Sequence, residues 1–210
     1  MSAAVSDPVS APTVVAVVCT ANRCRSPLAA AILARDLARA ERERAERERA
    51  EHVRAEPSVM VVSFGTEATE LPATPGTVIA ARRIGLDLAT HVATRIDPAV
   101  LTQASLVVTM ERRHVQDVAI AAPAAFPRTY TLKELVRRGS AIGARGPDER
   151  LDAWIARAGA DRRPVDVLGR SPIDDVADPT VDRLVDHDAL AAELSELSAR
   201  LVALAWPLSG

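Results

Sequence analysis

Two residues near the start of the chain have the types and spacing for nucleophilic chemistry on an anion. Cys19 follows directly after the apolar run 14–18, and Arg25 stands six positions later. A cysteine at the mouth of a loop of backbone N–H groups lies in a positive potential, which favours the nucleophilic thiolate. The planar guanidinium of Arg25 can bind two phosphoryl oxygens at once. The spacing predicts an oxyanion-binding loop with Cys19 as its nucleophile.

The other residues of this segment suit a tight loop that leads into a helix. Asn22 tolerates the left-handed backbone that such a loop needs. Ser26 is predicted to cap the following helix, with Pro27 at its first position, and its hydroxyl can also hydrogen-bond the sulfur of Cys19. We expect these residues to line the anion site: Thr20, Ala21, Asn22, Arg23, Cys24 and Ser26.

The chain has only two cysteines, Cys19 and Cys24, five positions apart. This number and spacing give neither a disulfide framework nor a four-ligand zinc site. Cys24 has two possible roles, as a packing residue or as the partner of Cys19 in a protective disulfide under oxidation. The use of Cys19 is therefore expected to be chemical, and no cofactor is indicated.

The elements that must position this loop alternate between strands and helices. The β-branched run 14–18 suits a strand buried on both faces, and it is followed by an Ala- and Leu-rich helix. Further strands are predicted at 59–62, 106–110 and 130–132, and further helices at 77–86, 111–120 and 186–204. The alternation predicts an α/β fold with a mainly parallel sheet, whose strands bind ligands at their carboxyl ends.

A chain of 210 residues, 48% of them hydrophobic, is expected to form a single domain. We predict a disordered tail over 1–12 and a single domain over 13–206. Within it, the Glu- and Arg-rich stretch 41–56 extends the first helix with a solvated face, and 139–172 is an insertion. Trp154 in that insertion either covers the site as a lid or packs a small helix on the domain.

Charge and hydropathy restrict the partners. A formal net charge of −2 provides no global basic field for nucleic acid. No apolar stretch approaches the roughly 20 residues that span a bilayer. The first residues lack the basic and apolar regions of a signal peptide. We expect a cytoplasmic protein with no nucleic-acid or membrane partner.

The segment 19–27, C-T-A-N-R-C-R-S-P, resembles the phosphate-binding loop of low-molecular-weight protein tyrosine phosphatases. The likeness continues in order through 63–66, 91–95, 104–110, 130–135 and 175–179. The resemblance implies a four-stranded parallel sheet with helices on both faces, and metal-free hydrolysis through a phosphocysteine. Cys19 would attack phosphorus while Arg25 and the loop amides stabilise the equatorial oxygens. The expected ligands are phosphate or another oxyanion, and the expected substrates are phosphorylated proteins or small phosphomonoesters.

The segment D-V-A-D-P at 175–179 resembles the family's D-I-x-D-P, whose second aspartate is the general acid. By this resemblance Asp178 would protonate the leaving oxygen and then activate the hydrolytic water. Asp175 is the alternative, and an exchange of roles with Asp174 also stays open. His91 and His114 are far from the loop in sequence, and we expect them to make structural hydrogen bonds.

Three residues depart from the family pattern or its variants. Ala21 stands where members usually have glycine, so altered activity is expected. Thr180 replaces an aromatic that many members carry, so an aryl substrate loses stacking of about 0.5–1.5 kcal/mol. Arginine phosphatases, which resemble this family, favour Thr where this chain has Arg23. If Arg23 is more than a solvent-exposed residue, its charge would repel a guanidinium leaving group and favour acidic or multiply phosphorylated substrates.

Two other functions compete with a cysteine-dependent protein phosphatase. One is an arsenate reductase of the same fold that uses a small-molecule thiol, since the chain has no further cysteine for a thioredoxin relay. The match at 175–179 weighs against it. The other is a weakly catalytic oxyanion-binding regulatory protein, suggested by Ala21, Thr180 and the charged helix extension.

Overall fold

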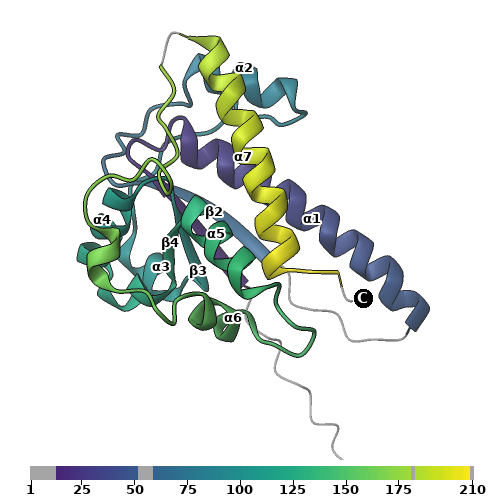
Figure 1. The fold of residues 1–210 in the computed structure, drawn as a ribbon. Helices are drawn as coiled ribbons and strands as arrows, with labels where there is room; N and C mark the ends of the chain where they lie inside the picture. The colour runs from purple at the N-terminus through teal and green to yellow at the C-terminus, as the bar shows by residue number, and fades with distance from the viewer. Residues whose placement is uncertain (1–12, 52–58, 181–182, 209–210) are drawn as a thin grey trace, which may run out of the picture.

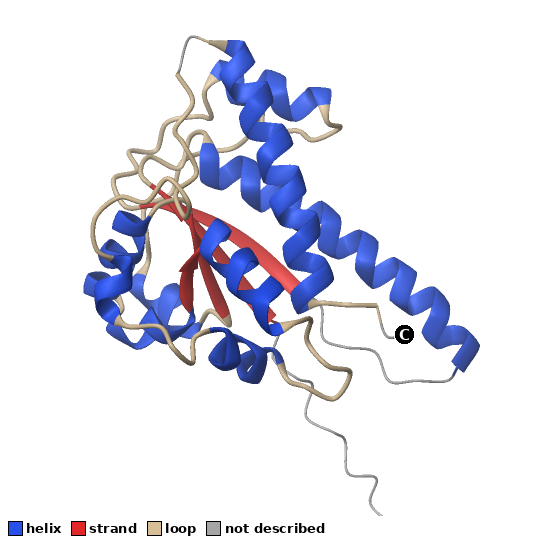
Figure 2. Ribbon diagram, in the orientation of Figure 1, coloured by secondary structure: helices blue, strands red, loops and turns tan. Residues whose placement is uncertain are grey.

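A computed structural model describes residues 13–51, 59–180 and 183–208. A sheet of four strands lies at its centre: β1 (Thr13–Cys19), β2 (Val59–Gly65), β3 (Leu106–Thr109) and β4 (Thr129–Thr131). The strand order is β2-β1-β3-β4, and all three pairings are parallel (Figure 2). The predicted four-stranded parallel sheet is confirmed.

Strand β1 contacts both helical layers because its side chains alternate between the two faces of the sheet. Val15, Val17 and Cys19 belong to a core that includes residues of α1 (Arg25–Glu51), α5 (Leu132–Ile142), α6 (Leu151–Ala158) and α7 (Leu184–Ala205). Ala16 and Val18 belong to a core with α3 (Pro98–Gln103), α4 (Arg112–Ala121) and the 3₁₀ segment η1 (Pro123–Arg128). Helices cover both faces, as expected (Figure 1).

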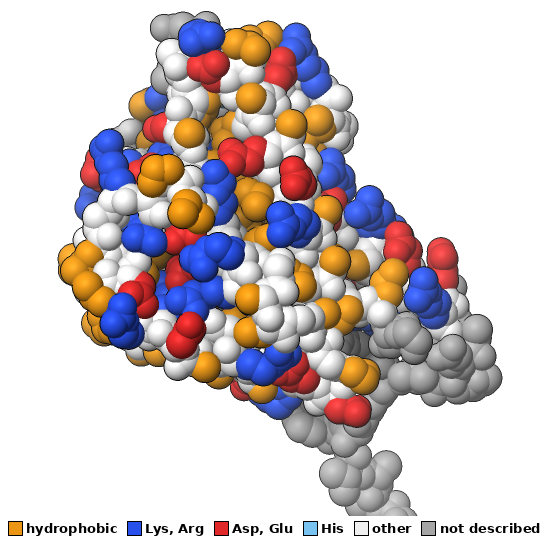
Figure 3. Space-filling model, in the orientation of Figure 1, with side chains coloured by type: hydrophobic (Ala, Val, Ile, Leu, Met, Phe, Trp, Pro, Cys, Tyr) orange, Lys and Arg blue, Asp and Glu red, His pale blue; other side chains and the backbone are white. Residues whose placement is uncertain are grey.

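Two further short helices complete the described chain. α2 (Pro75–Arg83) lies against α7, and the 3₁₀ segment η2 (Pro164–Val167) lies against α4. No helix in the described ranges has both the length and the apolar character to cross a bilayer. On the face drawn in Figure 3, basic and acidic side chains are interspersed and hydrophobic ones are scattered among them.

The start of α1 differs from the prediction. The helix begins at Arg25, the N–H of Leu28 donates to the carbonyl of Cys24 at 3.3 Å, and Ser26 lies inside the first turn. Ser26 is therefore not the cap, and Pro27 is not the first helical residue. The physical reason is that the Ser26 hydroxyl has partners in the loop and in β2, including the carbonyl of Phe64 at 3.1 Å.

The charged extension of α1 is helical as far as Glu51, and residues 52–56 lie outside the described chain. Most of its described side chains are exposed, as predicted for a solvated face. Arg44 is an exception, because it is buried and donates to the carbonyls of Trp206 at 3.4 Å and Pro207 at 3.2 Å. The tail 1–12 also lies outside the described chain.

The interpretation of Trp154 as a lid is wrong. Its side chain is fully buried, its indole N–H donates to the carbonyl of Gly143 at 3.1 Å, and its ring packs against Gly139. Helix α5 carries the chain from the carboxyl end of β4 to the opposite end of the sheet before α6 begins (Figure 1). Trp154 therefore stabilises the core and supplies no wall to the site.

Candidate active site

The loop 20–24 leaves the carboxyl end of β1 and is held by the end of β2. The N–H groups of Thr66 and Glu67 donate to the carbonyls of Cys19 at 2.9 Å and Thr20 at 2.8 Å. Gly65 permits this close approach, because a Cβ there would lie 2.5 Å from the carbonyl oxygen of Thr20. The match at 63–66 thus contains a residue that the loop requires for steric reasons.

Asn22 fixes the shape of the loop. Its backbone is left-handed, with φ of 54°, as predicted for this position. Its buried side-chain amide donates to the hydroxyls of Ser26 at 2.8 Å and Ser63 at 2.9 Å, and accepts from the N–H of Thr94 at 2.8 Å. Nε2 of His91 contacts the Asn22 carbonyl at 2.7 Å. The polar atoms of the Asn22 side chain thus all hydrogen-bond within the protein. The backbone N–H of Asn22 faces the sulfur of Cys19.

Polar groups surround the sulfur of Cys19, which is 3% exposed. The N–H of Asn22 donates to Sγ at 3.3 Å, and the Ser26 hydroxyl lies 3.0 Å from it. Both cysteines are free thiols, and Sγ of Cys24 lies 3.2 Å from the hydroxyl of Thr74 at the start of α2. Cys24 therefore packs toward α2 in this structure, while Cys19 faces the donors of its own loop.

Arg25 is almost completely buried and connects three segments of the chain. Its guanidinium donates to the carboxylate of Glu111, to the carbonyl of Val176 at 3.1 Å and to the Thr20 hydroxyl at 3.4 Å. Oδ1 of Asp178 lies 2.9 Å from Nε, although the N–H bond is not aimed at it. The fold thus brings Cys19, Arg25 and Asp178 to one edge of the sheet.

Glu111 is a site residue that the sequence reasoning missed. It follows β3 directly, and the carboxyl ends of adjacent parallel strands lie at the same edge, so its position contained a signal. Burial by itself raises the pKa of this carboxyl, but hydrogen bonds from Arg25 and Arg113 outweigh burial and hold the pKa below its usual value. Glu111 therefore stays an anion that orients Arg25.

The first turn of α4 also reaches the loop. Nε2 of His114 lies 3.0 Å from the Thr20 hydroxyl, and the Arg113 guanidinium donates to that hydroxyl as well. Burial, together with the charges of Arg25 and Arg113, lowers the pKa of His114 to about 3. The expected structural hydrogen bonds are present at His91 and His114, and both histidines contact the loop despite their distance in sequence.

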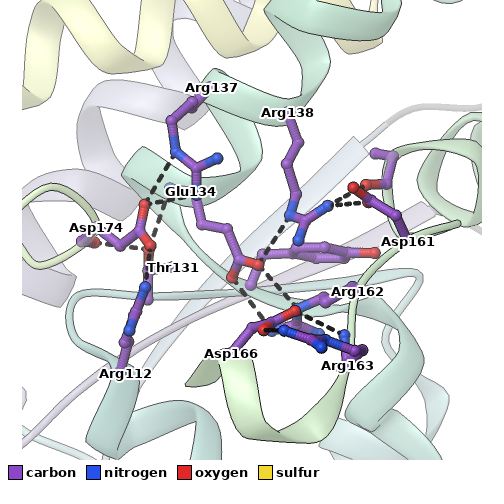
Figure 4. A network of polar contacts seen from close by, with 12 residues as sticks. Arg112, Thr131, Glu134, Arg137, Arg138, Asp161, Arg162, Arg163, Asp166 and Asp174 are labelled. Atoms are coloured by element: carbon purple, nitrogen blue, oxygen red, sulfur yellow. Dashed lines mark hydrogen bonds and ion pairs between the residues drawn. The ribbon is translucent and has the colours of Figure 1, made fainter. Parts of the chain in front are cut away.

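The three aspartates of the following segment have different environments. Asp174 binds Arg112 at 2.7 Å and Arg137 at 2.9 Å (Figure 4). Asp175 accepts from the backbone N–H groups of Arg112 at 2.9 Å and Ser171 at 2.8 Å. Asp178, 62% exposed, is the member of the three that pairs with Arg25.

Two of the three departures, Ala21 and Arg23, belong to the loop itself. Ala21 is exposed and does not adopt a positive φ, so its Cβ fits without strain. Arg23 is half-buried and donates from Nε to the carbonyl of Pro72 at 2.8 Å. A cleft of about 520 Å³ borders Asp178, and no aromatic side chain is among its described lining residues, which include Arg113, Lys133 and Arg170.

Known proteins resemble this chain in sequence and in structure. Residues 14–141 match the model of the family described as low molecular weight phosphotyrosine protein phosphatase. The chain belongs to this family. It is 28% identical over 120 residues to the probable low molecular weight protein-tyrosine-phosphatase EpsP of Ralstonia nicotianae, covering 57% of this chain and 70% of EpsP.

Solved structures of phosphatases also resemble the chain. A low molecular weight protein tyrosine phosphatase from Bacillus subtilis shares 25% identity and a TM-score of 0.60 over 91% of this chain and 96% of that one. A YwlE arginine phosphatase mutant with a phosphorylated active-site serine shares 25% identity and a TM-score of 0.57 over 90% and 93%. The chain is thus a phosphatase of the low molecular weight family, and its α/β fold is that of its relatives.

Proposed function

We propose that this phosphatase hydrolyses phosphomonoesters of cytoplasmic proteins through a phosphocysteine at Cys19, with Asp178 as general acid and base. The observation that carries the proposal is the meeting of three groups at one sheet edge. The sulfur of Cys19 and the buried guanidinium of Arg25 come from the segment 19–27, and the exposed carboxyl of Asp178 comes from the segment 175–179. This arrangement has a nucleophile, an oxyanion partner and a proton donor.

In the first step the Cys19 thiolate attacks phosphorus and the ester P–O bond breaks. Asp178 gives its proton to the departing oxygen, so the leaving group departs as a neutral alcohol. Arg25 and the N–H groups of the loop stabilise the charge on the equatorial oxygens, which is the main work of the protein in phosphoryl transfer. The products of this step are the free alcohol and a phosphocysteine.

In the second step water attacks the phosphocysteine and the S–P bond breaks. Asp178, now ionised, takes a proton from the attacking water, and Cys19 leaves as a thiolate. Inorganic phosphate is released and the starting state returns. A serine phosphorylated at the active site of a YwlE arginine phosphatase mutant supports a phosphoenzyme for this chain by analogy.

The environments of the aspartates support Asp178 over its neighbours. A general acid must reach the leaving group, and both oxygens of Asp175 already accept backbone N–H groups. Asp174 is buried, and an arginine binds each of its two oxygens, so it is not open to a leaving group. Asp178 is exposed beside Arg25. For substrate binding we assign the backbone of Thr20, Ala21, Asn22, Arg23 and Cys24, with Ser26 placed to hydrogen-bond the nucleophile.

Metal-free hydrolysis of para-nitrophenyl phosphate under reducing conditions tests the proposal. We expect the wild type to turn over, Cys19→Ser to be inactive and Asp178→Asn to fall by about 10²- to 10⁴-fold in kcat. Asp175→Asn is the matched control and should keep the larger part of the activity if it remains folded. Turnover by Cys19→Ser, or an equal loss in both aspartate variants, would contradict the assignment. An inert wild type that reduces arsenate with a small thiol would favour the reductase alternative.

A further inference from the structure

We propose that His114 is a positioning residue of this phosphatase, which holds Thr20, and through it Arg25, by a neutral Nε2–H. This inference rests on the proposed function, since the loop that it positions is the proposed phosphate site. Nε2 of His114 lies 3.0 Å from the hydroxyl of Thr20, the residue that follows the nucleophile Cys19. His114 itself is buried and belongs to α4, the helix that follows β3, the strand next to β1.

The partner of the second ring nitrogen determines the tautomer. Nδ1 lies 3.1 Å from the backbone nitrogen of Glu111. A backbone N–H can only donate, so Nδ1 is the acceptor and the hydrogen of the neutral ring is on Nε2. His114 therefore donates to Thr20. A protonated ring would place a hydrogen on Nδ1 facing the Glu111 N–H, so the cation is incompatible with this arrangement.

Thr20 connects this hydrogen bond to the charges of the site. Its hydroxyl oxygen accepts hydrogen bonds from the Arg113 guanidinium and from Nε2–H of His114. Nη2 of Arg25 lies 3.4 Å from the same oxygen. Its carbonyl accepts from Glu67, so both polar ends of Thr20 are held. A cationic side chain in place of His114 would add a third positive charge beside two guanidiniums. A neutral imidazole supplies a donor without that repulsion.

Two substitutions separate the contacts of the ring. His114→Asn can keep an acceptor near Nδ1 for the Glu111 N–H but is too short to reach Thr20. His114→Gln is long enough to place an amide N–H near the position of Nε2. We expect His114→Asn to lower kcat/KM for para-nitrophenyl phosphate by about five- to tenfold, the equivalent of one hydrogen bond. His114→Gln should keep activity within about threefold of the wild type.

The coupling to Thr20 is the decisive readout. Thr20→Val removes the hydroxyl, so the double variant with His114→Asn should be no worse than Thr20→Val alone. Tyr130→Phe is the control, because Tyr130 is also almost fully buried but its hydroxyl donates to the carbonyls of Pro127 at 3.3 Å and Ile155 at 3.2 Å, which are not part of the loop. It should lower the melting temperature without changing kcat/KM.

The pH profile of kcat/KM is a second readout. His114→Gln should keep both limbs of this profile, since His114 does not titrate in the cycle.

The affinity for inorganic phosphate, measured by calorimetry, tests the contact between His114 and Thr20 without requiring turnover. If the wild type binds phosphate but hydrolyses nothing, the proposed function fails, and the order of affinities among these variants still tests His114. Multiplicative losses in the double variant would overturn the inference. So would wild-type kcat/KM in folded His114→Asn, or equal losses in the Asn and Gln variants. A wild type that neither binds nor hydrolyses phosphate esters would overturn both proposals.

Discussion

The carboxylate of Glu111 binds the guanidinium of Arg25, although 86 positions separate the two residues in the chain. The contact forms because β1 and β3 are adjacent parallel strands, so the segments that follow them meet at one edge of the sheet. The second oxygen of Glu111 accepts from Nε of Arg113 at 2.9 Å. One partly buried anion thus orients two guanidiniums beside the loop.

Glu111→Gln should lower kcat/KM more than it lowers folding stability. The amide can still accept one hydrogen bond but no longer attracts Arg25, and a small misplacement of a catalytic group costs about 10- to 100-fold in rate. Steady-state kinetics with para-nitrophenyl phosphate measures the effect. Glu111→Asp keeps the charge and should recover part of the loss. Unchanged kcat/KM in folded Glu111→Gln would show that Arg25 does not need this partner.

Protonation of Asp174 should make the free energy of unfolding depend on pH. Burial by itself raises the pKa of its carboxyl, but the hydrogen bonds from Arg112 and Arg137 prevail and hold the pKa below its usual value. A depressed carboxyl pKa contributes stability that is complete above the unfolded-state value, near 3.8, and is lost as the pH falls through the folded value. Urea unfolding between pH 7 and pH 3 measures this loss.

Asp174→Asn supplies the matched comparison for that titration. It leaves the two arginines without their anion, and because both are partly exposed we expect a loss of about 1–2 kcal/mol at pH 7. The difference between the variant and the wild type should begin to shrink as the pH falls below about 4, where the carboxyl of the unfolded chain takes up a proton, and should be smallest once the folded carboxyl is neutral as well. A difference that stays constant across this range would show that Asp174 remains paired in acid or contributes little.

Arg23→Thr should change the choice of substrate more than the chemistry. Arg23 belongs to the loop and its guanidinium donates to the carbonyl of Pro72, so we expect its charge to disfavour a guanidinium leaving group and to favour acidic substrates. We expect the ratio of kcat/KM for phosphoarginine over phosphotyrosine peptides to rise by about tenfold, as one unit charge in partly solvated surroundings allows. Peptides with acidic and neutral flanks complete the comparison, and unchanged ratios would remove Arg23 from substrate selection.

Trp154→Ala should destabilise the fold and leave the active site intact. Trp154 is fully buried against α5, and truncation of such a side chain costs about 3–5 kcal/mol. Urea denaturation measures the loss, and kcat under native conditions should stay near the wild-type value. Ile120→Ala, at a position that is 81% exposed, is the control with little effect on either quantity. A lowered kcat at unchanged stability would restore the role of Trp154 as a lid.

The sequence by itself determined the sheet and the loop. The β-branched runs around Val15 and Val107 favour buried strands, and their alternation with helices favours the parallel pairing that the structure shows. The positions of Cys19, Asn22 and Arg25 follow from local spacing, because a short loop between a strand and a helix leaves few conformations. Both the fold class and the left-handed Asn22 were therefore predictable.

Only the tertiary structure decided which distant side chains serve that loop. Glu111 and His114 reach it because β3 lies beside β1, and the pattern of either segment taken alone does not contain that pairing. The contrast between Asp175, capped by backbone N–H groups, and Asp178, beside Arg25, depends on how the chain folds back across the sheet edge. Local sequence fixes local backbone, whereas long-range hydrogen bonds and ion pairs form only after the strands are in register.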